Sequence, residues 1–112
     1  MPTPEQIDTI RRLNDAARTH PGLASLANVT MGFQALPELD RFAALVAITR
    51  FTKFDGDNDP YGEHDFGAVE VGGVRFFWSI DAYDRNLVGR SPDPSDPSVT
   101  VRVLTIMRAD EY

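Results

Sequence analysis

The residues best suited to chemistry lie in an acidic segment near the middle of the chain. His64 stands between Glu63 and Asp65. A neighbouring carboxylate orients an imidazole and favours its charged form, which is the arrangement that a general base requires. One interpretation is therefore a small metal-dependent hydrolase with His64 as its base. The groups that would orient the ring or hold the metal ion are Glu63, Asp65, Asp81 and Asp84.

The same segment also has the composition of a binding surface. From Asp55 to Asp65 the chain carries five acidic residues and no basic residue, and Tyr61 stands between a proline and a glycine. Clustered carboxylates attract arginine and lysine on a partner, and an exposed tyrosine can anchor an interface. We expect a protein partner with a basic surface. The candidate binding residues are Asp57, Asp59, Tyr61, Glu63, His64, Asp65, Asp81, Tyr83 and Asp84.

A calcium loop of the EF-hand type is the first metal site to consider. Asp55, Asp57 and Asp59 alternate as the first ligands of such a loop do. The sixth position requires glycine and has Pro60, and the twelfth requires a bidentate glutamate and has Phe66. The sequence therefore excludes an EF-hand. A solvated acidic loop is the more frequent explanation of such a run, and we predict no metal.

Other catalytic and cofactor patterns are missing from the sequence. The chain has no cysteine, which excludes thiolate metal sites and cysteine nucleophiles. His20 and His64 are too far apart for the paired histidines of a zinc hydrolase, and Ser79 lacks the glycine-rich elbow of a serine nucleophile. The pair Gly72-Gly73 does not open a helix, so it is no phosphate loop. We predict no cofactor and favour a protein that is not an enzyme.

A hairpin turned by glycines must position the candidate site. Gly72-Gly73 supplies the positive φ angles of a two-residue turn between the runs 66–71 and 74–81. Continuing the register of this turn places His64 opposite Asp81. A structural hydrogen bond between the two side chains is a simpler interpretation of this pair than a catalytic role. One face of the hairpin is apolar and should pack on helices, with the indole across Gly67; its residues are Val69, Val71, Val74, Phe76, Trp78 and Ile80.

The remaining elements complete an α+β domain. A helix begins at the capping box of Thr3 and ends at Pro21-Gly22, and a second runs from Pro37 to near Phe51. Strands are predicted over residues 28–33 and 99–107, the second after a proline-rich loop. The prediction is one domain, residues 1–112, with two helices on one face of a small antiparallel sheet of about four strands. The order is helix, strand, helix, hairpin, strand.

Composition limits the partners and the location. The net charge of −6 disfavours nonspecific binding to nucleic acid or anionic lipid. The longest apolar run, residues 42–48, is far shorter than the roughly 20 residues of a membrane-spanning helix. The first residues lack the basic and apolar stretches of a secretory signal, so we expect a cytoplasmic protein. A third, purely structural possibility is a homodimer formed through the last strand, whose ladder we expect to be partly unpaired.

Three stretches of the sequence, residues 57–67, 80–84 and 102–107, resemble the bacterial domain-of-unknown-function family DUF3768, and the resemblance covers most of the chain. It implies a stand-alone cytosolic protein, met chiefly in proteobacteria and often near plasmid or other mobile-element genes. It brings no assigned activity and no catalytic residues. The favoured hypothesis is a non-enzymatic interaction module that acts through the acidic segment. Its role would be that of a mobile-element accessory or an inhibitor of a host defence complex.

Overall fold

The computed structural model describes residues 2–112 and begins with the predicted helix. α1 (Pro4–Thr19) starts at a complete capping box: the hydroxyl of Thr3 accepts from the amide of Gln6, and the Gln6 side chain accepts from the amide of Thr3. Pro4 takes the first helical position, where the lack of an amide hydrogen has no cost. The helix ends at Thr19, just before Pro21, so this prediction is confirmed.

The four strands form one sheet in the order β1-β4-β3-β2. They are β1 (Leu26–Val29), β2 (Phe66–Val71), β3 (Val74–Tyr83) and β4 (Val101–Arg108). The α+β class is confirmed, but the sheet is mixed, because β1 runs parallel to β4 while the other pairs are antiparallel. The prediction of a purely antiparallel sheet was wrong here, since no hairpin constrains the direction of a strand that pairs with a distant segment.

The strand predicted over residues 28–33 is shorter than expected. β1 ends at Val29, and the hydroxyl of Thr30 accepts a hydrogen bond from the amide of Phe33 to cap the short helix α2 (Met31–Gln34). The apparent alternation through Met31 therefore did not indicate an extended chain. Met31 is 86% exposed, while Phe33 is buried in the core.

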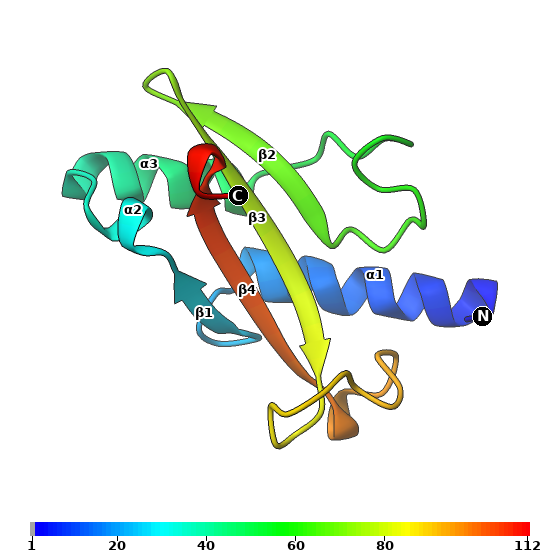
Figure 1. The fold of residues 1–112 in the computed structure, drawn as a ribbon. Helices are drawn as coiled ribbons and strands as arrows, with labels where there is room; N and C mark the ends of the chain where they lie inside the picture. The colour runs from blue at the N-terminus through cyan, green and yellow to red at the C-terminus, as the bar shows by residue number, and fades with distance from the viewer. Residues whose placement is uncertain (1) are drawn as a thin grey trace.

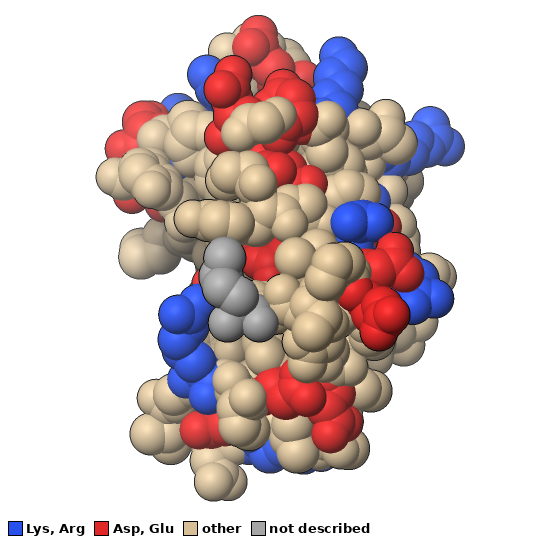
Figure 2. All heavy atoms as spheres, turned by 90° about the vertical axis from the view of Figure 1, so that its right-hand side faces the viewer, with Lys and Arg blue, Asp and Glu red and all other residues tan. Residues whose placement is uncertain are grey.

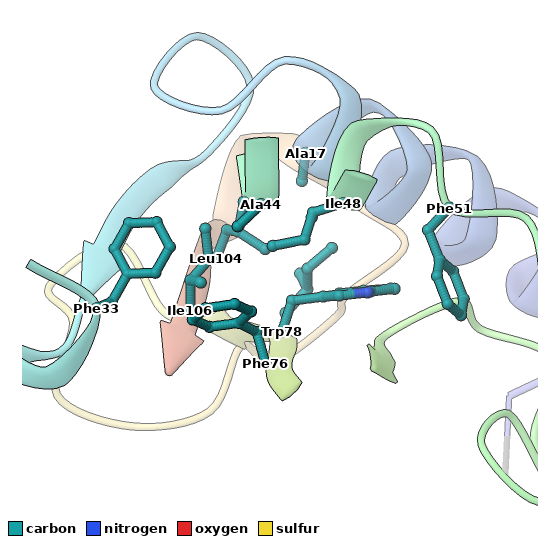
Figure 3. Packing of buried hydrophobic residues seen from close by; sticks show 10 residues of the cluster. Ala17, Phe33, Ala44, Ile48, Phe51, Phe76, Trp78, Leu104 and Ile106 are labelled. Atoms are coloured by element: carbon teal, nitrogen blue, oxygen red, sulfur yellow. The ribbon is translucent and has the colours of Figure 1, made fainter. Parts of the chain in front are cut away.

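α3 (Glu38–Thr49) follows Pro37 as predicted, and it packs beside α1 on one face of the sheet (Figure 1). The core lies between these helices and the sheet. Figure 3 shows the indole of Trp78 beneath Ile48, with the ring of Phe51 near its outer end. The buried cluster comprises Ala17, Phe33, Ala44, Ile48, Phe51, Phe76, Trp78, Ile80, Leu104 and Ile106.

The hairpin register is confirmed over both strands. Val71 faces Val74 and Gly67 faces Trp78, while Gly72 and Gly73 have φ angles of 60° and 78°. A Cβ atom at position 67 would lie 2.6 Å from the indole Nε1, so only glycine fits there. The indole therefore crosses the strand at the point that the register predicted.

The last strand is not an edge of the sheet. β4 pairs with β1 from Val103 to Ile106 and with β3 along its whole length. β4 is an inner strand, and the edges of the sheet are β1 and β2, although β1 pairs with only part of β4. A homodimer stays a prediction. None of the helices of residues 2–112 combines the length and apolar character needed to span a bilayer.

Candidate functional site

The acidic segment is tied to α1 by side chains of that helix. Nε of Arg11 donates to the carbonyl oxygen of Gly62 at 2.6 Å, and Nδ2 of Asn14 donates to the carbonyl oxygen of Glu63 at 2.9 Å. Figure 1 shows the segment between α3 and β2 passing alongside α1. Because carbonyl groups of the loop are satisfied by the helix, the loop has a defined conformation despite its lack of regular structure.

His64 is the main side-chain connection between the loop and α1. Its Nδ1 lies 2.9 Å from Oδ1 of Asp15, and its Nε2 lies 3.6 Å from Oδ2 of Asp59. The imidazole stacks on the ring of Phe54, with 3.6 Å between centroids and 3° between planes. Nδ1 is thus within hydrogen-bonding distance of Asp15, whereas Nε2 is close to Asp59 but beyond hydrogen-bonding distance. The contact with Asp15 fixes the orientation of the imidazole and ties the loop to α1.

The predicted pairing of His64 with Asp81 is therefore wrong. The β2–β3 ladder begins at Phe66, and one further bond joins the amide of Ile80 to the carbonyl oxygen of Asp65 at 2.8 Å. His64 has a φ of 56°, in the left-handed region, so the chain leaves the strand direction there. Asp81 lies beyond the last pair of the β2–β3 ladder, Phe66 with Ser79, and on the other side of β3 it pairs with Val103 of β4. The predicted pairing assumed that the strand stays extended before Phe66, and this assumption was wrong.

Several carboxylates of the loop hold its own backbone. Oδ1 of Asp55 accepts from the amides of Asp57 and Asn58, at 2.9 and 3.0 Å. Asp59 accepts from the amide of His64 at 3.0 Å, and its side chain is only 6% exposed. Asp59, predicted to be part of a binding surface, therefore faces inward. Asp57 remains exposed to solvent.

A buried arginine, Arg18, contacts Asp15 from the core side of α1. Nη1 of Arg18 lies 2.9 Å from Oδ1 of Asp15, the oxygen that also contacts His64. The guanidinium carbon lies 5.3 Å from the centroid of Phe54 and 5.4 Å from that of Trp78. Arg18 was not among the predicted site residues. It lies next to Ala17 on the buried side of α1.

A second group of the predicted residues lines a cavity of about 410 Å³. Glu63, Asp65 and Asp81 contribute acidic side chains, and Tyr83 contributes part of the wall. The cavity lies between α1, the residues before β2, the end of β3 and the β3–β4 connection. Asp84 is not part of it, because its carboxylate accepts amide hydrogen bonds within the turn that follows β3.

Two arginines, neither of them predicted as site residues, line the same cavity: Arg90 and Arg102. Arg102 is 6% exposed; its Nε donates to Oδ1 of Asn14 at 2.7 Å and its Nη2 to the carbonyl oxygen of Pro94. The sequence did hold a signal, because Arg102 shares the face of β4 that carries the buried Leu104 and Ile106. A charged residue in that alternation indicates a buried charge.

Burial changes the acid–base properties of this cavity. Desolvation raises the pKa of Glu63, and the nearby charges of Asp65 and Asp59 raise it further. Desolvation is also the main cause that raises the pKa of Asp65. It lowers the pKa of Arg102, and the charge of Glu63 opposes that effect. Charges of both signs are thus partly removed from water in one small space.

The comparison with known families agrees with the resemblance in the sequence. A family model described as "Protein of unknown function (DUF3768)" matches residues 29–111. The chain belongs to this family. No curated protein and no solved structure matches the chain.

In this member of DUF3768 the matched region contains every predicted site residue, but not the residues of α1 that hold the loop. Among residues 2–112 no group of three histidine, aspartate or glutamate side chains is arranged to hold a metal ion. Figure 2 shows that acidic side chains on the face it presents form separate groups, with basic and uncharged side chains between them. On that face the negative charge is thus divided into local groups.

Proposed function

We propose that this chain is a non-enzymatic protein-interaction module that binds a basic partner surface through the acidic loop 55–65. The observation that carries the proposal is the attachment of this loop to α1 by Arg11, Asn14 and Asp15. A loop that is already ordered loses less conformational entropy on binding than a mobile one. Such attachment is expected of a surface that must be presented in one shape.

The exposed residues of the loop suit the core and rim of an interface. Tyr61 is 71% exposed at the loop surface, and Asp57 is exposed nearby in the sequence. An exposed tyrosine provides a large contact area with few rotatable bonds, and carboxylates at the rim accelerate association with a positive partner. Binding should therefore weaken as salt concentration rises.

The position of His64 favours interaction over hydrolysis. A catalytic base needs a nitrogen within reach of a substrate, whereas His64 is not among the residues that line the cavity of about 410 Å³, and its Nδ1 is held by Asp15. The finer roles, a mobile-element accessory or an inhibitor of a host defence complex, stay predictions, as does a bacterial, cytoplasmic origin. No described residue bears on them.

Affinity capture from a lysate of the native host tests the proposal. The double variant Asp57→Asn with Tyr61→Ala removes the exposed charge and the aromatic contact without touching the bonds between loop and helix. The matched control is Glu70→Gln with Leu87→Ala, an exposed acid and an exposed apolar residue elsewhere. We expect a protein captured by the wild type and by the control to be lost with the loop variant. Equal capture by all three would contradict the proposal.

A further inference from the structure

The buried cation of the cavity has no anionic partner within the described chain. None of the ion pairs among residues 2–112 includes Arg102, although its side chain is almost fully removed from solvent. Its two hydrogen bonds go to neutral oxygens of Asn14 and Pro94. Nη1 has no hydrogen-bond partner in residues 2–112, and it is not among the polar atoms buried without a partner, so it is accessible from the solvent. A buried charge is costly unless it is paired, so this guanidinium is suited to receive an anion.

The carboxylates that line the cavity have no paired cation within the described chain. Glu63 and Asp65 also line it, and neither carboxylate forms an ion pair with a residue of the described range 2–112. Burial is the main cause that raises the pKa of each carboxyl, so both carboxylates are partly removed from water without a paired cation from residues 2–112. Glu63 and Arg102 both line the cavity, yet they do not form an ion pair with each other.

We propose that this cavity binds a small zwitterion of the amino-acid class, with its carboxylate at Arg102 and its ammonium group at Glu63. Such a ligand supplies both missing charges at once, and the cavity lining includes a second arginine, Arg90, and a second carboxylate, Asp65. The volume of about 410 Å³ lies within the range of small-molecule sites, roughly 300–1,000 Å³. An anion alone would leave the carboxylates uncompensated, and a cation alone would leave Arg102 unpaired.

This site shares Glu63 and Asp65 with the acidic loop 55–65. It uses neither Asp57 nor Tyr61, the exposed residues that the test of the protein interaction replaces, so the two proposals are tested by different variants. A negative result in the capture experiment would not contradict the ligand site, and a negative result in the ligand titration would not contradict the protein interaction.

The test is a titration of the intact protein with a set of matched compounds. Binding is measured by isothermal titration calorimetry and by the shift of the Nε–H resonance of Arg102 in NMR spectra. The zwitterions are glycine, β-alanine, γ-aminobutyrate, ε-aminocaproate, glutamate and lysine, which vary the spacing and number of charges. The singly charged counterparts are butylamine and butyrate. We expect at least one zwitterion to bind about tenfold or more tightly than either counterpart, because each charge-assisted hydrogen bond contributes to affinity.

Variants of the cavity keep the test specific. Glu63→Gln preserves the backbone carbonyl that Asn14 binds, and Arg90 is exposed, so Arg90→Gln should also fold. Each should weaken the best zwitterion by about tenfold or more. The matched controls, Glu70→Gln and Arg85→Gln, remove the same charges outside the cavity and should leave affinity unchanged.

The proposal is overturned by any of three results. The first is the absence of binding by every zwitterion at millimolar concentration. The second is binding of butylamine or butyrate as tight as that of the best zwitterion, which would make the cavity a simple ion site. The third is a zwitterion that binds with the same affinity to the wild type, to Glu63→Gln and to Arg90→Gln, and that does not shift the Nε–H resonance of Arg102.

Discussion

Nδ1 of His64 lies 2.9 Å from Oδ1 of Asp15, although the two residues are 49 positions apart in the chain. This contact joins the middle of α1 to the end of the acidic loop. The same Asp15 oxygen contacts the buried Arg18, which lies over the rings of Phe54 and Trp78. The conformation of a surface loop is therefore linked to the packing of the core.

Replacing Asp15 with asparagine should loosen the loop and destabilise the protein. The change leaves Arg18 without its only carboxylate in the described chain and weakens the contact with His64. We expect a loss of about 1–3 kcal/mol in the free energy of unfolding, measured by urea denaturation, and faster cleavage within residues 55–65 by a protease. Asp8→Asn is the control, because Asp8 forms only exposed ion pairs with Arg11 and Arg12, and it should cost less than about 1 kcal/mol. Equal losses in the two variants would disprove the special role of Asp15.

Asn14 connects two parts of the site, and its replacement by alanine should affect both. Its amide group accepts from Nε of Arg102 and donates to the carbonyl oxygen of Glu63. Asn14→Ala leaves a buried charged donor without a partner, so we expect a loss of about 2–4 kcal/mol by denaturant unfolding. Asn86→Ala, at an exposed position, should change stability by about 0.5 kcal/mol or less. A loss under about 1 kcal/mol for Asn14→Ala would show that water replaces these bonds.

Gly67 is required by the close approach of the indole of Trp78. A Cβ atom there would lie 2.6 Å from Nε1 and 2.8 Å from Cε2 of that ring. Gly67→Ala should therefore lower the free energy of unfolding by about 1–3 kcal/mol, together with a shift in the tryptophan fluorescence spectrum. A methyl group added at Gly56 would have nothing within 4 Å, so Gly56→Ala serves as the control and should be nearly neutral. An unperturbed melting temperature in Gly67→Ala would rule out this packing.

The raised pKa values of Glu63 and Asp65 predict how stability depends on pH. A carboxyl whose pKa is higher in the folded state holds its proton more tightly there, so stability increases as pH falls through the folded value toward the ordinary values of 4.5 and 3.8. The double variant Glu63→Gln with Asp65→Asn lacks this gain. The difference in unfolding free energy between wild type and variant should therefore shift in favour of the wild type as the solution is acidified from neutrality. A difference that stays constant, or moves the other way, would contradict the burial of these carboxyl groups.

Local patterns in the sequence were sufficient for the elements and for part of the site. The capping box at Thr3 and the glycine turn at residues 72–73 specify their geometry through neighbouring residues, and both are found as predicted. The parallel pairing of β1 with β4 and the contact of His64 with Asp15 join segments far apart in the chain. No local pattern records such contacts.

The left-handed conformation of His64 is the clearest example of this limit. Its φ of 56° redirects the chain shortly before the ladder begins, and it sends the imidazole toward α1. Non-glycine residues seldom adopt this conformation, so strand periodicity predicts an extended residue there. Tertiary contacts with Asp15, Asp59 and Phe54 stabilise the rarer backbone.

Hydrogen exchange of the loop amides is the most direct test of an ordered acidic surface. The amides of Asp59, Gly62 and His64 donate within the loop, to the carbonyl oxygens of Asp55 and Asp59 and to Oδ1 of Asp59. At neutral pH and low salt these three amides should exchange at least about tenfold more slowly than in an unstructured peptide of the same sequence. Exchange at the peptide rate would show that the loop is mobile, and the proposed surface would then have no fixed shape.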